Sequence, residues 1–361
     1  MRTVELSNYT IGDDCFDAIP EVLALHEVKR VMLIGGERAL AAAAPGIEAS
    51  LAGTDVEILG RHVYGKNSTR ENIAKIVNSP LAQAVDALFA IGGGKAIDTV
   101  KTANIELNKK VFSVPTICSN CSAGTAIAVV YNADGSLEGY SYPHCPDHIF
   151  INPAIIAAAP AEYFWAGIGD ALSKQPEVEY ATSAGNLEHT AALGLALAHM
   201  CSEPLFAYGE QGLKDVRAKV SSEAVRQIAL DIVVNTGYVS NLTNQKDFYY
   251  NSSVAHAFYN ASCSIARPGS YLHGEVVSFG VLVLLAYIGD RANLERYAAF
   301  NKKLGLPVTL DALGLDEGSI PALCEAAHAT NEWKQGNPKS FSDERFAQAI
   351  KDADVLGGSL A

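Results

Sequence analysis

The first 160 residues repeat one pattern, in which a short apolar run leads into a turn and then into a stretch with helical periodicity. The apolar runs cover residues 30–34, 56–59, 87–91 and 111–114, and glycine turns and helices follow the first and the third. Alternation of strands with helices is typical of a parallel β-sheet that carries helices on its faces. We therefore expect an α/β domain at the N-terminus.

The chain changes character after about residue 160. Ala- and Leu-rich stretches over 188–202, 222–237 and 275–289 place apolar residues at helical spacing, with few β-branched clusters between turns. This pattern predicts an all-α C-terminal domain. Because 361 residues exceed twice the length of a typical domain, we expect two domains, formed by residues 1–158 and 159–361.

Composition limits the partners and the compartment. The net charge of −13, without a Lys/Arg cluster, argues against nucleic acid and anionic membranes as partners and favours a small-molecule substrate. The first residues do not resemble a signal segment, and no run of about 18 apolar residues offers a membrane span. The seven cysteines are scattered and odd in number, which argues against a disulfide framework. We expect a cytoplasmic protein with reduced thiols.

Gly92, Gly93, Gly94 and Lys95 follow an apolar run and open a helix. Glycines at such a place let backbone N–H groups approach a phosphate, and the helix N-terminus adds partial positive charge. The segment is neither Gly-x-Gly-x-x-Gly nor a Walker loop, because Ala96 stands where a Walker loop needs Ser or Thr. The segment predicts a pyrophosphate site, although a tight turn alone would also account for it.

Glu37 follows the first glycine turn, where a nucleotide-binding sheet meets the adenosine ribose. A carboxylate there accepts hydrogen bonds from both ribose hydroxyls and repels a 2′-phosphate, which favours NAD over NADP. The alternative is an acidic residue in the first turn of a helix, which the helix dipole stabilises. The hydroxyl-rich loop 115–125 could bind the same cofactor at the carboxyl edge of the sheet. Its Cys118-Ser-Asn-Cys121 lacks the context of a redox or zinc motif.

Asp170, His256 and His273 could together hold a divalent metal. One carboxylate and two imidazoles are a set used by zinc sites that leave a fourth position open for water or substrate. The ligands lie 86 and 17 residues apart, so neither spacing is diagnostic in itself. Pro176, six residues after Asp170, would either kink the ligand-bearing helix or mark a shorter first turn.

Five segments resemble, in order and at similar spacing, the glycerol dehydrogenase branch of the iron-containing (group III) alcohol dehydrogenases. These segments are residues 92–98, 114–117, 167–172, 255–257 and 273–275, and the similarity covers essentially the whole chain. The resemblance implies a dehydroquinate synthase-like fold, with an NAD-binding α/β domain, a helical metal- and substrate-binding domain, and the metal and substrate in the cleft between them. It also implies a homo-oligomer.

Carried over by position, the resemblance implies that Asp170, His256 and His273 are the metal ligands. The residues that it implies as cofactor contacts include the acidic residue, the glycine turn and the loop after the fourth strand: Glu37, Gly92, Gly93, Gly94, Lys95, Asp98, Thr116, Ser119, Thr125, Ile127 and Tyr131.

Departures from the family pattern bear on the substrate and on the metal. Cys121 stands where glycerol dehydrogenases carry a polyol-binding Asp, and a branch that reduces 2-oxo acids has a Cys there. Tyr259 replaces a second histidine, so a proton relay through that position would use a phenol. Lys174 replaces the fourth ligand of the iron-binding branch, which favours zinc over iron. Arg267 could bind a substrate carboxylate, or be an ordinary loop arginine.

The predicted reaction is hydride transfer between NAD(P) and a small alcohol of the glycerol or 1,2-diol type, with the substrate oxygen on the metal. A dehydrogenase acting on 2-hydroxy acids is the alternative within the same chemistry. Two alternatives of another class are a dehydroquinate synthase-like lyase and a nucleotide-binding homologue without turnover. The lyase is disfavoured because few Lys or Arg residues stand near the ligands, and the inactive homologue because all three ligands are present.

Overall fold

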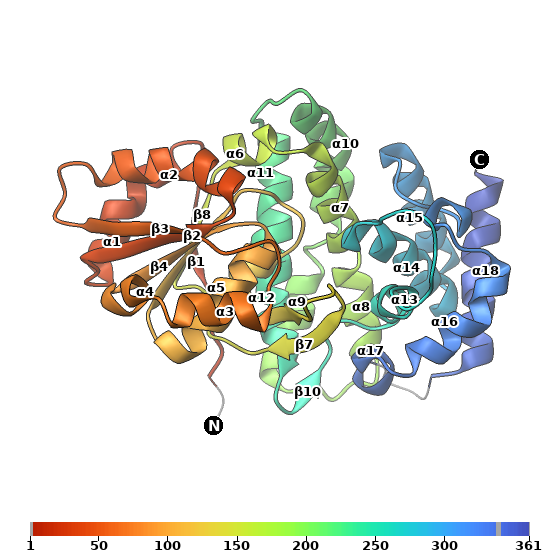
Figure 1. Cartoon of the computed structure of the whole chain (residues 1–361). Helices are drawn as coiled ribbons and strands as arrows, with labels where there is room; N and C mark the ends of the chain where they lie inside the picture. The colour runs from red at the N-terminus through yellow and green to blue at the C-terminus, as the bar shows by residue number, and fades with distance from the viewer. Residues whose placement is uncertain (1–2, 337–340, 361) are drawn as a thin grey trace. The chain divides into compact units, whose positions relative to one another are not determined.

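The computed structural model describes residues 3–336 and 341–360, which form two compact units (Figure 1). The first unit contains the residues up to Ala161 together with Lys214–Asn241, and the second contains Glu162–Leu213 and the residues from Leu242 onward. The expected domains, 1–158 and 159–361, are two consecutive segments, whereas here residues 214–241 lie in the first unit although part of the second unit precedes them in the chain. Tyr238 donates to Ser7 O at 2.6 Å, and Asn241 donates to Gly124 O at 2.9 Å.

A six-stranded parallel sheet forms the centre of the first unit. Its strand order is β1-β8-β5-β4-β2-β3, so the chain runs outward from β2 to β3 on one side and from β4 through β5 to β8 on the other. The four predicted runs lie in β2, β3, β4 and β5, whereas β1 and β8 were not predicted. The strands are β1 (Asn8–Ile11), β2 (Arg30–Gly35), β3 (Glu57–Val63), β4 (Ala87–Gly92), β5 (Lys110–Pro115) and β8 (His148–Ile151).

Helices cover both faces of this sheet (Figure 1). Successive strand residues point to opposite faces, and Leu33, Phe89 and Phe150 belong to the buried cluster that includes α1 (Ile19–Leu25) and α2 (Glu37–Leu51). On the opposite face lie α3 (Arg70–Val77), α4 (Pro80–Ala84) and α5 (Gly94–Leu107). A sheet covered on both faces explains why β4 is buried at every residue.

The rest of the first unit is built from shorter elements. A hairpin of β6 (Ala128–Tyr131) and β7 (Leu137–Ser141) follows the loop after β5. After β8 comes α6 (Pro153–Ala158), and the segment 214–241 contributes α11 (Glu223–Leu230), a π-helix over Asp231–Asn235 and most of α12 (Thr236–Thr243).

The second unit is almost entirely helical, as the apolar periodicity predicts. Its centre is α14 (His273–Ile288), in which twelve of the sixteen residues are buried. A helix buried nearly all round lies inside a bundle rather than on its surface. The other elements are α7 (Ala161–Ala171), α8 (Lys174–Ala181), α9 (His189–Ala198), α10 (Glu203–Arg217, shared with the first unit), β9 (Asn244–Gln245), β10 (Phe248–Tyr249), α13 (Val254–Ser262), α15 (Arg291–Leu304), α16 (Ile320–Ala327), α17 (Asn331–Gln335) and α18 (Asp343–Ser359).

Candidate metal centre and nucleotide site

Asp170, His256 and His273 come together in the second unit. Asp170 is the penultimate residue of α7, His256 lies in the first turn of α13, and His273 begins α14. Asp170 Oδ1 lies 3.0 Å from His273 Nε2 and 3.7 Å from His256 Nε2, and all three ligand atoms lie within 4.8 Å of one another. Among the described residues, this is the only group of three or more His, Cys, Asp or Glu with such spacing.

Glycines explain why three helices can meet closely enough to form this group. A Cβ on Gly274, next to His273, would lie 1.8 Å from Ala166 O, so α14 touches the backbone of α7. A Cβ on Gly280 would lie 2.5 Å from Ala255 O, so α14 also touches the backbone of α13. The glycines therefore set the separation of the ligand-bearing helices, and a larger residue at either position would force them apart.

The charges of the group are coupled to a fourth residue, the buried Glu177. Burial raises the pKa of Asp170, but the two histidines outweigh burial and hold it well below its ordinary value. Burial lowers the pKa of His256, but Glu177 and then Asp170 outweigh it and raise that pKa to about 10. A cation bound by these side chains would compete with the proton that the two carboxylates favour on His256.

The donor set fits one divalent cation. A carboxylate oxygen and two imidazole nitrogens are the ligand types that zinc and other first-row divalent ions accept. The ligand atoms of the three side chains face one another at close range, two basic nitrogens beside one carboxylate oxygen. These side chains are the residues that would hold the ion.

The predicted pyrophosphate turn lies between β4 and α5 in the first unit. Gly92 ends the strand with a φ of +148°, which L side chains rarely adopt, and Gly93 is the residue before the first turn of α5. A Cβ on Gly93 would lie 2.4 Å from Ile117 Cδ1. Because α5 has no side-chain cap, its first N–H groups are available to an anion, as in a dinucleotide site. Lys95 Nζ lies 5.0 Å from the centre of the Tyr131 ring.

Asp98, which the resemblance implies as a cofactor contact, forms several internal hydrogen bonds. Its carboxylate is buried and accepts hydrogen bonds from Ser122 Oγ at 2.5 Å and from Val129 N at 3.0 Å. Lys101 Nζ lies 3.1 Å from the same carboxylate. These three groups connect α5 to the following loop, and a direct contact of Asp98 with the cofactor stays a prediction.

Lys101 is a buried residue that the sequence analysis missed. Its ammonium donates to the carbonyl oxygens of Ser122 at 2.8 Å, Thr125 at 3.1 Å and Ile127 at 2.6 Å. The Thr125 hydroxyl is also turned to this ammonium, at 3.2 Å. Thr125 and Ile127 thus shape the predicted cofactor loop through Lys101. The available signal was the spacing of Lys101 three residues after Asp98 within an apolar helix.

Comparison with known proteins identifies the family. Residues 7–153 match the model of iron-containing alcohol dehydrogenase. The chain is 30% identical to a glycerol dehydrogenase of Thermotoga maritima, over 83% of the chain and 82% of that protein. It is 34% identical to a glycerol dehydrogenase of Citrobacter freundii, over 75% and 74%. The chain belongs to the iron-containing alcohol dehydrogenase family. The crystal structure of a probable glycerol dehydrogenase from Sinorhizobium meliloti matches with a TM-score of 0.85 at 26% identity, over 99% of this chain and 100% of that one.

Membership of the iron-containing alcohol dehydrogenase family confirms several predictions. The fold class is confirmed by the parallel sheet, the helical second unit and the structural match. The glycerol dehydrogenase-like branch and the class of metal- and NAD-dependent alcohol oxidoreductase are confirmed by the relatives. Among the described residues, no helix combines the length and apolar character needed to cross a membrane.

The other predicted cofactor residues of this alcohol dehydrogenase lie in the first unit. Glu37 is exposed at the first position of α2, directly after Gly36. Thr116 is buried, and its N–H donates to Gly92 O at 3.1 Å, which ties the two predicted cofactor loops together. Ser119 is half-buried in the loop after β5.

Cys121 and Cys118 have different surroundings. Cys121 is half-buried before the short 3₁₀ turn Ser122–Gly124, whereas Cys118 is buried. Burial, and then the nearby Asp231, raises the pKa of the Cys118 thiol, which suppresses the reactive thiolate. This agrees with the interpretation that Cys118 and Cys121 do not form a redox motif.

Two further predicted residues lie near the ligands in sequence. The Tyr259 ring is perpendicular to the His273 ring, with 4.2 Å between centroids, so the phenol belongs to the surroundings of the metal ligands. Arg267 donates to Leu313 O at 3.1 Å and to Ser262 Oγ at 3.2 Å, and it lies over the Tyr271 ring. The Arg267 guanidinium is thus hydrogen-bonded to Leu313 and to Ser262, the last residue of α13.

Lys174 and Pro176 follow the ligand-bearing helix rather than belong to it. The helix α7 ends at Ala171, and α8 begins at Lys174. Lys174 is buried and donates to Asn251 O and Oδ1, at 3.1 and 2.7 Å. Of the two roles expected for Pro176, the structure shows the position in a first turn, where its missing N–H removes no helical hydrogen bond.

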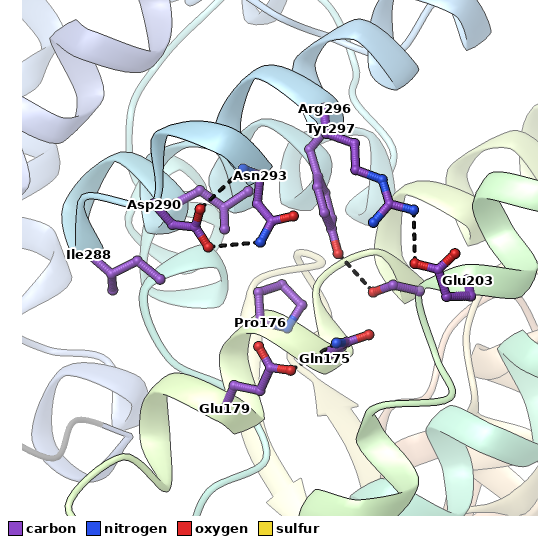
Figure 2. A pocket seen from close by; sticks show the side chains of 11 residues that line it. Gln175, Pro176, Glu179, Glu203, Ile288, Asp290, Asn293, Arg296 and Tyr297 are labelled. Atoms are coloured by element: carbon purple, nitrogen blue, oxygen red, sulfur yellow. Dashed lines mark hydrogen bonds and ion pairs between the residues drawn. The ribbon is translucent and has the colours of Figure 1, made fainter.

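Pro176 also lines a polar cavity of about 50 Å³ in the second unit, which none of the three predicted ligands lines (Figure 2). Ser202 Oγ lies 2.7 Å from the Tyr297 hydroxyl there, and Arg296 donates to Glu203 at 2.8 Å. A cavity of this size has room for one or two water molecules. The main polar groups around it are paired with one another, so it gives no indication of a substrate site.

Proposed function

We propose that this protein is a zinc-dependent, NAD-linked dehydrogenase of small 1,2-diols such as glycerol. The observation that carries the proposal is the convergence of Asp170, His256 and His273 in a chain whose relatives include glycerol dehydrogenases. The reaction oxidises the alcohol carbon: a hydride passes to NAD⁺, the hydroxyl proton is released, and a carbonyl compound and NADH result.

Different residues of the chain would bind the metal, transfer the proton and bind the cofactor. When bound, a divalent ion supplies Lewis-acid polarisation of a substrate oxygen. Asp170, His256 and His273 would hold the ion, and Tyr259, packed on His273, stands where a phenol could pass the hydroxyl proton to solvent. The first N–H groups of α5 would hold the pyrophosphate.

Zinc is proposed over iron because, among the described residues, the group has three N/O ligands and no histidine as a fourth ligand. Lys174 stands where the iron-binding branch has that ligand, and its ammonium is bound to Asn251. Three protein ligands with an open position are the usual catalytic zinc arrangement. NAD is proposed over NADP because the exposed carboxylate of Glu37 would repel a 2′-phosphate.

A second candidate function is the reduction of 2-oxo acids to 2-hydroxy acids. Cys121 favours it, because this position is an Asp in glycerol dehydrogenases and a Cys in the branch that reduces 2-oxo acids. Arg267 gives it no support, since its guanidinium is engaged by Leu313 and Ser262. The diol interpretation is preferred on the strength of the relatives.

The test is absorbance at 340 nm with zinc-loaded protein against two substrate panels. One panel contains 1,2-diols including glycerol with NAD, and the other contains 2-oxo acids with NADH or NADPH, each repeated after chelation. We expect chelator-sensitive turnover of diols. Turnover confined to oxo acids would establish the second candidate, and silence in both panels would contradict dehydrogenase activity.

Self-association and a cytoplasmic location are further parts of the proposal. The family resemblance supports a homo-oligomer, which light scattering on the purified protein would test. The described residues contain no disulfide, in keeping with a reducing compartment.

A further inference from the structure

We propose that Glu177 is a positioning residue of the metal centre, which sets the orientation and the tautomer of His256. This inference rests on the proposed metal-binding role of Asp170, His256 and His273. It concerns a residue that the sequence analysis did not select, seven residues after Asp170 on a different helix, α8.

Glu177 is completely buried, and both of its carboxylate oxygens are used around one residue. Oε1 accepts hydrogen bonds from Ser253 N at 2.7 Å and from His256 N at 3.0 Å. Oε2 accepts a hydrogen bond from His256 Nδ1 at 2.6 Å. A buried carboxylate requires such partners, and here all three come from the first turn of α13.

The backbone bonds show that Glu177 replaces the ordinary cap of α13. Ser253 is the capping residue by position, but its φ of −149° and ψ of −121° leave its side chain without a capping hydrogen bond. Its hydroxyl is buried without a partner. Glu177 instead accepts from the N–H groups at the cap and at the third helical residue, the two donors that a capping box satisfies. These hydrogen bonds connect the start of α13 to α8.

The hydrogen bond between Glu177 and the His256 ring bears on metal binding. With Nδ1 donating to Glu177, the neutral His256 ring has its lone pair on Nε2, the atom that lies 3.7 Å from Asp170 Oδ1. A metal ligand must present a lone pair, and an outer carboxylate of this kind fixes both ring orientation and tautomer. The Glu177 carboxylate therefore fixes the start of α13 and orients the His256 ring.

A second buried glutamate provides a matched control. Glu332 is 2% exposed and accepts from Ser252 Oγ at 3.1 Å and from Asn260 Nδ2 at 3.0 Å, so it too holds α13 and the residue before its cap. Neither of these partners is a metal ligand. Comparison of the two glutamates distinguishes orientation of the His256 ring from stabilisation of α13.

The experiment measures metal affinity without turnover, by titrating Co²⁺ or Zn²⁺ into metal-free wild type, Glu177→Gln and Glu332→Gln, with Co²⁺ absorbance and calorimetry as readouts. In Glu177→Gln, the introduced amide would keep an oxygen for the backbone donors but offer an NH₂ group to Nδ1–H. We expect roughly 10- to 100-fold weaker binding for Glu177→Gln and unchanged binding for Glu332→Gln.

Equal affinity of wild type and Glu177→Gln would overturn the proposal, as would an equal loss in both variants or no metal binding by wild type. If Glu177→Gln does not fold, the ring ¹⁵N shifts of His256 in zinc-loaded wild type decide. Protonated Nδ1 and metal-bound Nε2 support the proposal, and the reverse pattern overturns it. Wild type that binds metal but turns over neither substrate panel would defeat the proposed function and leave the Glu177 result standing.

Discussion

Each unit contains a cluster of ionisable side chains, buried in the first unit and half-buried in the second, and the clusters differ in their source of a cation. In the first unit, the ammonium of Lys101 is surrounded by oxygens of Asp98, Ser122, Thr125 and Ile127. In the second, the facing atoms of Asp170, His256 and His273 have one another as neighbours. The first cluster contains its own cation, whereas the second is the proposed site of a metal cation.

The comparison distinguishes a charge with a structural role from the proposed metal site. Every partner of the Lys101 ammonium is a protein oxygen, so the cluster is complete and shapes a loop. The second cluster has basic nitrogens at close range to each other, with ring centroids of His256 and His273 5.4 Å apart, an arrangement that a divalent ion would stabilise. Burial of charge alone does not indicate function, but the convergence of several ligand-type side chains makes a site a candidate for metal binding.

The largest expected effect comes from removing a ligand of the second cluster. We expect His273→Ala to lower turnover roughly 10³-fold, because Lewis-acid stabilisation contributes several kcal/mol to the transition state. Steady-state assays at 340 nm measure this, with NAD binding followed by fluorescence to show that the first unit is intact. His199→Ala, an exposed histidine paired with Glu179, is the control and should keep the wild-type rate. A fully active His273→Ala would remove the basis of the comparison.

Removing the cation of the first cluster should instead affect stability. Lys101→Met would leave Asp98 buried without its ionic partner, and we expect the free energy of unfolding to fall by about 3–5 kcal/mol. Urea unfolding measures the change. Lys75→Met, which removes an exposed ion pair with Glu71, is the control and should have no measurable effect. An equally small effect of Lys101→Met would show that the buried cluster does not hold the loop.

The histidines of the two units should respond to pH in opposite directions. Burial, and then the nearby His26, lowers the pKa of His148 in β8 to about 4, whereas the pKa of His256 is raised. Because an unfolded histidine has a pKa near 6.5, the unfolded chain binds more protons between pH 6.5 and 4. The contribution of His148 is therefore present above pH 6.5 and lost as pH falls toward 4.

We expect this loss to amount to about 2–3 kcal/mol between pH 7.5 and 4.5. Urea unfolding at both pH values, on wild type and His148→Gln, measures it. The variant lacks the titrating group, so its stability should depend less on pH by that amount. Identical pH dependence in the two proteins would show that His148 does not stay neutral.

The smallest effect is expected from Glu37. Replacement by Ser removes the carboxylate expected to bind the ribose hydroxyls, which should weaken NAD binding roughly tenfold and reduce discrimination against NADP. Calorimetric titration with each nucleotide measures this. Metal affinity should not change, because Glu37 and the ligands belong to different units. A parallel loss of metal affinity would contradict the separation of the two regions.

The sequence allowed prediction of the parts that rest on local pattern. Strands β2, β4 and β5 are continuous apolar runs bounded by turns, and α14 has an apolar residue at nearly every position. Strand β1, Asn8–Ile11, is polar and partly exposed, so it has no such signal. Its place in the sheet depends on pairing with β8, whose His148 is hydrogen-bonded to Thr10 across 138 positions of sequence.

The candidate site likewise contains residues that could be predicted from the sequence and residues that could not. Ligand-type residues stand out by their chemistry, and the family motifs linked Asp170 to His256 and His273. Glu177 was missed because its meaning depends on Ser253 and His256, which lie 76 and 79 residues away. The ion pair between Asp98 and Lys101 was missed for the same reason, because burial of Lys101 cannot be recognised from the sequence. Both interactions depend on the tertiary structure.

The most direct test of the central claim is a titration of zinc into metal-free protein with NAD and a 1,2-diol present, followed by absorbance at 340 nm. We predict no turnover before metal is added, a linear rise, and saturation at one zinc per chain, with no such rise in His273→Ala. Turnover that survives metal removal, or that saturates equally in the variant, would contradict the claim that these three side chains hold the catalytic metal.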